Sequence, residues 1–157
     1  MTFAVTYWTV ADAPSADDPL DRLIVRLANA YEEPWLLKFH LDDVGSAAGR
    51  AAELCDPAMA VRTRDQVLTA RDYLSAYVLE WTLHHLDLTA YLPEVADPPA
   101  PGLAQSRWML EKIACVAFPE SFSDKDALLI STGRREPTDA ERARLGGLAS
   151  KLPLVLR

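Results

Sequence analysis

The pattern Glu80-Trp-Thr-Leu-His84 offers the clearest chemistry in the chain. Side chains four residues apart on a helix lie on one face, with Cβ atoms about 5–6 Å apart. A carboxylate oxygen and an imidazole nitrogen can then converge on one divalent cation, and zinc accepts this mixture of ligands. Asp87, one turn further along, is expected to orient His84 by accepting its second N–H. The same spacing is common in surface pairs and in internal pairs satisfied by an arginine, here Arg71.

A catalytic zinc site needs a third protein ligand. His85 points about 100° round the helix from His84, so we do not expect both on one ion. His40, on the flank of an earlier apolar stripe, is the candidate third ligand, and its alternative role is that of a boundary residue. Arg134 can hold a carboxylate through two hydrogen bonds, unless its loop is simply a solvated basic turn. Together with Tyr77, it is our candidate for substrate binding.

The elements that must position these residues are mainly helical, because apolar residues recur at helical spacing. Residues 60–68 allow a short extended piece, and 127–131 predict a short strand or an extension of a helical turn. Thr69 looks like an N-cap, and Thr138 with Glu141 has capping-box spacing. The helix after Thr69 is apolar nearly all the way round, which predicts a buried central helix. The expected helices cover residues 19–31, 35–55, 70–92, 103–116 and 138–148.

Length and composition are those of one globular domain. The chain has 157 residues, half of them hydrophobic and a quarter charged. We expect a single domain over 1–157, with an extended arm at 1–18, a helical bundle core at 19–118 and a C-terminal loop and helix at 119–157. The chemistry-bearing residues fall in the second and third of these parts.

Charge and cysteine usage limit the function classes. A net charge of −7 argues against nucleic acid and anionic lipid as partners. No apolar run reaches the roughly 18–20 residues of a membrane span, and residues 1–20 lack the basic start of a secretory signal. Cys55 and Cys115 have no C-x-x-C spacing and are expected to be small core residues, which suits a reducing compartment. We therefore expect a cytoplasmic protein.

Two segments resemble a known family. The run from Asp72 to Leu88 resembles the metal-binding helix of the mycothiol-dependent maleylpyruvate isomerase family, which belongs to the DinB-like four-helix bundles. The run from Asp126 to Leu145 is similar to the tail of family members. The resemblance implies a mainly all-α, DinB-like bundle that binds a divalent metal, usually zinc, through Glu80, His84 and a histidine from an earlier helix. It further implies mycothiol or a similar low-molecular-weight thiol as co-substrate, and isomerisation or S-transfer on a small electrophilic acid.

The chain departs from that family at its beginning. Members start with two more helices, the second of which brings the first metal histidine, and the first residues of this chain resemble the segment after both helices. Either a second chain completes the bundle, or His40 substitutes, or the metal site is vestigial. Because a half-bundle exposes a large apolar face, we expect a homo-oligomer or a partner chain that supplies the missing helices. The alternative function is a non-enzymatic helical interaction module in which Glu80 and His84 are polar remnants.

Overall fold

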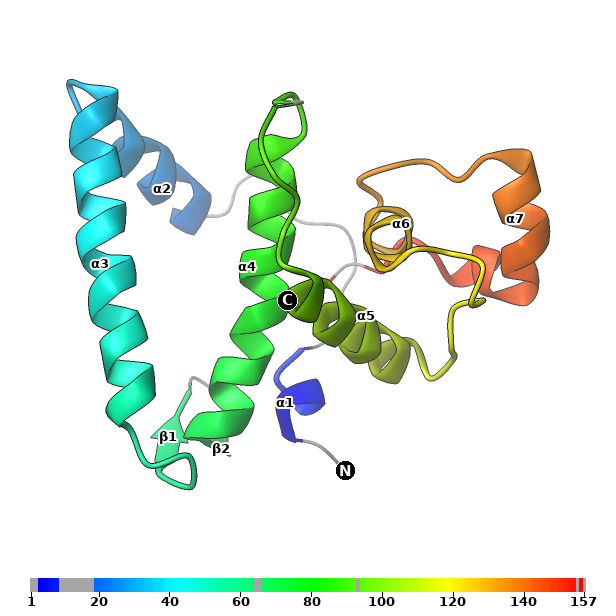
Figure 1. The fold of residues 1–157 in the computed structure, drawn as a ribbon, viewed down its shortest axis with the longest axis horizontal. Helices are drawn as coiled ribbons and strands as arrows, with labels where there is room; N and C mark the ends of the chain where they lie inside the picture. The colour runs from blue at the N-terminus through cyan, green and yellow to red at the C-terminus, as the bar shows by residue number, and fades with distance from the viewer. Residues whose placement is uncertain (1–2, 9–18, 64–65, 93, 155, 157) are drawn as a thin grey trace.

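The protein is mainly helical, as expected. The computed structural model describes residues 3–8, 19–63, 66–92, 94–154 and 156. Helices α2 and α3 stand on one side of α4, and α5, α6 and α7 lie on its other side (Figure 1). No helix of the described residues is long and apolar enough to cross a membrane. The elements are α1 Phe3–Thr6, α2 Pro19–Asn29, α3 Pro34–Leu54, β1 Ala60–Arg62, β2 Val67–Thr69, α4 Ala70–Thr89, α5 Ala100–Ala114, α6 Asp124–Ser131, α7 Asp139–Leu145 and a 3-10 helix at Gly146–Lys151.

The hydrophobic core lies where α4, α5 and α6 meet. α4 contributes Leu79 and α6 contributes Leu128, and both side chains are fully buried. α5 crosses α4 closely, because a Cβ added at Gly102 would lie 3.3 Å from the Thr82 hydroxyl. Segments from both ends of the chain pack on this core, among them Trp8 and Leu154. The body of the protein is therefore a compact helical unit built around one face of α4.

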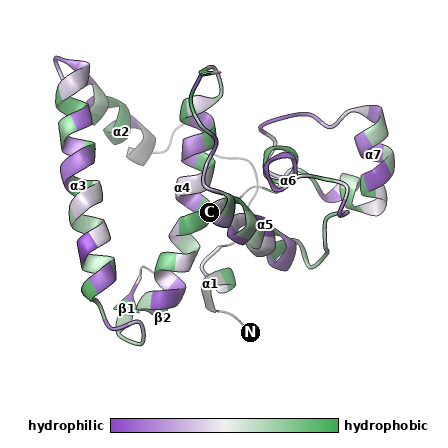
Figure 2. Cartoon of the chain, in the orientation of Figure 1, coloured by the Kyte–Doolittle hydropathy of each residue, from purple (hydrophilic) through white to green (hydrophobic). Residues whose placement is uncertain are grey.

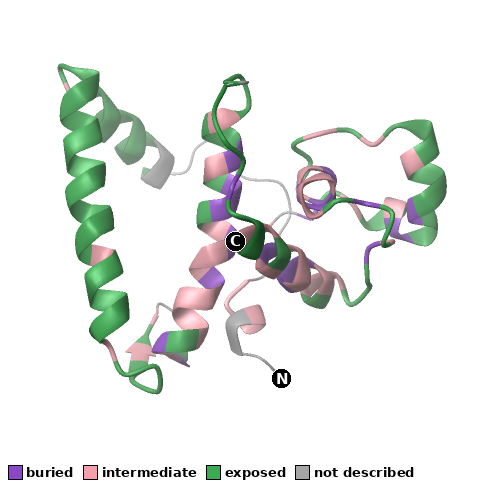
Figure 3. Cartoon of the chain, in the orientation of Figure 1, coloured by how far each residue is buried: buried purple, intermediate pink, exposed green. Residues whose placement is uncertain are grey.

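Helices α2 and α3, residues 19–54, form what we call the arm. α3 is 21 residues long and has no buried residue. The arm is exposed along almost its whole length (Figure 3), although it carries many apolar positions (Figure 2). It joins the body through a two-stranded antiparallel hairpin in which Ala60 pairs with Thr69. The arm therefore leaves much of its apolar surface in solvent.

The helix starts that the sequence predicts are confirmed. The Thr69 hydroxyl accepts a hydrogen bond from the backbone N–H of Asp72 and caps α4. Thr138 and Glu141 form both halves of a capping box at the start of α7. The extended piece expected at 60–68 is the hairpin of β1 and β2. Capping residues and turn chemistry thus fix these boundaries locally.

Several expectations from the sequence are wrong. For residues 127–131 the strand is wrong and the helical alternative is confirmed: they belong to α6, which Ser123 caps by accepting from the N–H of Asp126. The N-terminal segment 1–18, which was expected to be extended, contains the helix Phe3–Thr6, and residues 9–18 of this segment lie outside the described part. Cys115 is exposed and Cys55 is half-buried, so neither is a core residue.

α4 is also less buried than its sequence predicts. Its side toward α5 is buried, but Trp81 and Leu88 are 57% and 76% exposed. An apolar surface all round a helix predicts burial, yet burial needs neighbours on every side. On this helix the described residues supply neighbours on one side, and the other side remains open.

An ion-pair network holds the start of α7 against α6. Arg135 donates to both carboxylate oxygens of Glu141 at 2.9 Å and to Asp126 at 2.9 Å. The guanidinium of Arg135 and the hydrogen bonds from Thr138 lower the pKa of Glu141 to about 2. The ionised carboxylate of Glu141 therefore stabilises the folded state over most of the pH range.

We expect Glu141→Gln to lower the melting temperature at neutral pH and to matter less in acid. The stabilisation is complete above the unfolded pKa of glutamate, about 4.3, and is lost as the pH falls through about 2. Melting curves from pH 7 down to pH 2 should show the difference between the two proteins narrowing below about pH 4.3. Glu136→Gln is the matched control, because Glu136 is 85% exposed and should change little at any pH. If the difference in melting temperature between the two proteins stayed constant in acid, the role given to Glu141 would be wrong.

Candidate metal and ligand pocket on helix α4

Glu80 and His84 lie side by side on the open side of α4. His84 Nε2 is 3.1 Å from Glu80 Oε1, and the side chains of His84 and Glu80 are 63% and 39% exposed. Exposed pairs of this kind add little to stability. The pair is therefore not a buried structural ion pair, and both groups can be reached from solvent.

The spacing of the two groups fits part of a zinc shell. With Zn–N and Zn–O bonds of about 2.0–2.2 Å and tetrahedral angles, an N and an O on one ion lie about 3.3 Å apart. In the structure the two groups form a hydrogen bond of 3.1 Å, and this distance is close to that value. However, no group of three or more His, Cys, Asp or Glu among the described residues is placed to hold a metal. The pair can supply two ligands, and the described part of one chain does not supply the third.

A pocket opens directly beside this pair. Its volume is about 400 Å³, and its walls come from α4, from the segment after α6 and from both ends of the chain. The volume is within the range of small-molecule sites, at its lower end. Its lining residues are Trp8, Glu80, Leu83, His84, Thr132, Arg134, Leu154 and Leu156.

Arg134 enters the pocket from the turn that ends α6. Gly133 has a φ of 74°, a conformation that favours glycine, and it lets the chain reverse after α6. The backbone N–H of Arg134 then donates to the carbonyl of Leu129 at 2.8 Å, which fixes the turn. In the sequence, the Gly133-Arg134 pair is the local signal for this turn. The glycine therefore explains why the chain turns directly after α6 and places Arg134 at the pocket.

The guanidinium of Arg134 binds Asp87 through two hydrogen bonds. Nε donates to one carboxylate oxygen at 2.6 Å and Nη2 to the other at 2.7 Å. The expectation that Asp87 orients His84 is therefore corrected: among the described residues the Asp87 carboxylate accepts its hydrogen bonds from Arg134. Arg134 retains Nη1, which forms no hydrogen bond with any described residue. One face of this guanidinium thus remains able to bind an acidic group.

His40 does not join the pair. It lies on α3 in the arm, where its ring packs edge-on against Tyr31 with centroids 6.0 Å apart. It belongs to no metal-binding group with Glu80 and His84 among the described residues. Among the described residues of one chain His40 is therefore not the third ligand: it is an exposed residue of α3 whose ring contacts Tyr31.

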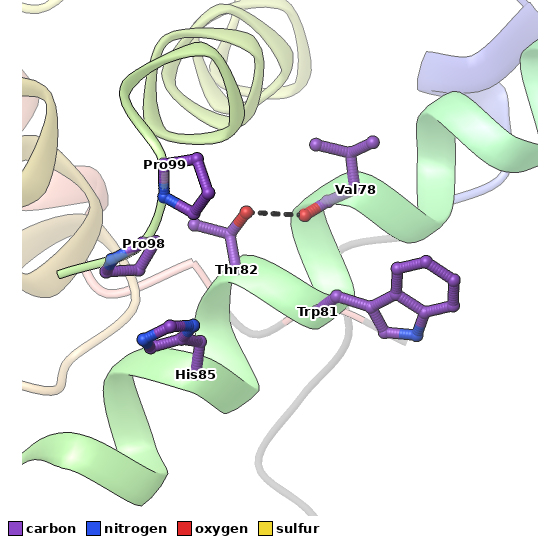
Figure 4. Close-up of a pocket in the computed structure, with 6 residues that line it drawn as sticks. All are labelled: Val78, Trp81, Thr82, His85, Pro98 and Pro99. Carbon is purple, nitrogen blue, oxygen red and sulfur yellow. Dashed lines mark hydrogen bonds between the residues drawn. The ribbon is translucent and has the colours of Figure 1, made fainter. Parts of the chain in front are cut away.

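His85 points to the other flank of α4, as its position on the helix predicts. Its Nε2 donates to the carbonyl of Ala96 at 3.0 Å. Figure 4 shows its ring beside Pro98, in a small groove of about 170 Å³ that Pro99, Val78, Trp81 and Thr82 also line. His85 therefore holds the loop before α5 in place.

Tyr77 lies in an aromatic cluster and does not line the pocket. The hydroxyl of Tyr73 donates to that of Tyr77 at 3.2 Å, and the ring of Tyr7 packs on both. Donating this hydrogen bond raises the pKa of Tyr73 above its usual value. The structure thus assigns Tyr77 to the packing of α1 on α4, which corrects its expected place in the substrate site.

The sequence does not single out the remaining wall of the pocket. Trp8 stands out, because its indole N–H is buried and has no hydrogen-bond partner among the described residues. Thr132, Leu154 and Leu156 reach the pocket from segments far from α4 in the sequence. Only tertiary packing brings these side chains together, so no local pattern could have identified them.

Comparisons with known proteins add no information about this pocket. No protein-family model matches the chain, and neither the curated proteins nor the solved structures contain a match.

Proposed function

We propose that the pocket beside α4 binds a divalent cation, zinc, through Glu80 and His84, and that it serves thiol transfer to, or isomerisation of, a small electrophilic acid. The observation that carries the proposal is the 3.1 Å approach of His84 Nε2 to Glu80 Oε1 on the wall of a pocket. The resemblance of the α4 sequence to the mycothiol-dependent maleylpyruvate isomerase family supports the choice of a low-molecular-weight thiol as co-substrate.

The charges in the pocket favour a cation. The charges of Arg134 and Asp87 cancel each other. When His84 is neutral, the carboxylate of Glu80 therefore gives the site a net negative charge. A divalent cation would make the site positive and attract an acid. A bound cation of this kind holds a thiol as its thiolate, which is the competent nucleophile.

One group of the chain is suited to position an acidic ligand. Arg134 Nη1 can donate to a carboxylate while Nε and Nη2 stay on Asp87. Glu80 and His84 retain the cation, and Arg134 orients the acid.

Zinc binding tests the proposal directly. We expect the purified chain to bind zinc in titration calorimetry, and His84→Ala or Glu80→Gln to weaken the binding at least about tenfold. His85→Ala is the matched control, because His85 is the neighbouring imidazole and faces the other flank of α4. The cobalt-loaded protein should also develop a thiolate-to-metal absorption band when a low-molecular-weight thiol is added. Zinc binding that is absent, or equal in the His84→Ala and parent proteins, would overturn the proposal.

A second candidate function is a helical interaction module that assembles through the arm. It is favoured by the absence of any buried residue in α3. Helices in water draw most of their stability from packing an apolar face, and α3 lacks such packing in the described structure. If the chain binds no zinc but assembles through the arm, this second function replaces the first.

A further inference from the structure

We infer that a second copy of this chain covers the arm, with the two α3 helices packed antiparallel about a two-fold axis that passes between Val44 and Ala48. This inference does not depend on zinc binding or catalysis. It rests on the exposure of the arm and on the order of side-chain sizes along α3.

The arm exposes large apolar side chains on both of its helices. On α2, Leu23 and Leu27 are 55% and 59% exposed, and on α3 Leu41 and Val44 are 59% and 53% exposed. Large apolar side chains that follow one face of a helix and lie in solvent mark an interaction site. Figure 1 shows α3 well apart from α5, α6 and α7, so the packed body of the same chain does not cover it.

Side-chain size falls along the apolar stripe of α3. The stripe repeats at intervals of four and three residues, which is the pattern of a helix that pairs with another helix. Its first half carries large residues and its second half small ones. In order, the stripe is Leu37, Leu41, Val44, Ala48, Ala51 and Cys55.

This gradient is self-complementary only when two copies run in opposite directions. With the two-fold axis on the stripe between Val44 and Ala48, Leu41 of one copy faces Ala51 of the other, and Val44 faces Ala48. Large residues then pack against small ones at every level, as dense helix packing requires. A parallel pair would instead place leucine against leucine at one end and alanine against alanine at the other.

The two-fold contact needs surface from both helices of the arm. Leu41 and Val44 on the stripe are 59% and 53% exposed, and Leu37 is 38% exposed. A standard interface buries roughly 800 Å² per partner, so the contact must also take in exposed leucines of α2, such as Leu23 and Leu27. The same patch serves both copies, as a two-fold dimer requires.

The oligomeric state of the full chain tests the inference. Light scattering should give twice the 17.4 kDa mass of one chain. Leu41→Asp should return the protein to a monomer with its helix content kept, because Leu41 is 59% exposed in one chain. Leu88→Asp, at an exposed leucine on α4, is the matched control and should remain a dimer. A monomeric parent protein, or a dimer that Leu41→Asp leaves intact, would overturn the inference.

Cross-linking tests the direction of the helices. In a Cys115→Ser background, Leu37→Cys should form an intermolecular disulfide with the native Cys55 of the second copy under mild oxidation. Adding Cys55→Ser should abolish this cross-link. A cross-link that survives Cys55→Ser would show that the Leu37 positions face each other, as in a parallel pair, and would contradict the antiparallel arrangement.

Discussion

Replacing Arg107 by alanine is expected to lower the free energy of unfolding by about 2–4 kcal/mol. Its guanidinium donates to the carbonyls of Phe118, Pro119 and Phe122 at 2.8–3.2 Å. It also binds the carboxylates of Glu111 at 3.0 Å and Asp124 at 3.2 Å. This side chain is 16% exposed, so its removal leaves half-buried acceptors without a donor.

The loss should be measured by urea denaturation. Arg107→Lys keeps the positive charge, but a lysine ammonium lacks the planar guanidinium that donates to all three carbonyls. This variant should therefore recover only a part of the lost free energy of unfolding. Arg142→Ala is the matched control on the surface, because Arg142 is 50% exposed and pairs only with Glu136 at 2.9 Å among the described residues. We expect this control to change stability by less than about 1 kcal/mol. An equal effect of both alanine variants would show that the Arg107 network does not hold α5 to α6.

Two leucines on α4 should respond very differently to truncation. Leu79→Ala is expected to cost about 2–5 kcal/mol, because Leu79 is 0% exposed and its removal leaves a cavity in the core. Leu88→Ala should cost about 0.5 kcal/mol or less, because Leu88 is 76% exposed. Both changes delete the same atoms from the same helix, so helix propensity cancels in the comparison.

Thermal and urea unfolding of the two variants would decide which side of α4 is buried. The sequence alone predicts a helix that is buried all round, and on that view both leucines would be equally costly. The structure predicts a large difference. If Leu88→Ala proved as destabilising as Leu79→Ala, the open side of α4 would be covered in solution, which would require a partner on that side.

Local signals account for most of the helices. Apolar spacing, the Thr69 and Thr138 caps and the prolines between segments predict helix positions close to those observed. The strand alternative for residues 127–131 fails for a local reason. A short apolar run fits a strand or a helix equally well, and here the Ser123 cap and the acidic first turn of α6 decide for a helix.

The part of the candidate site that lies on a single helix was predictable from the sequence. Glu80 and His84 are four residues apart on α4, and the sequence places them on one face. The partner of Asp87 was not predictable, because Arg134 is 47 residues away and reaches it through the turn after α6. The position of His40 depends on how the arm is oriented, which no local pattern encodes.

The walls of the pocket also fix an order of events during synthesis. Trp8 leaves the ribosome first and Leu156 last, and both line the same cavity. The arm is complete long before that, since it ends at Leu54. A chain cut short before Leu154 would therefore keep the whole arm but lose part of the wall of the pocket.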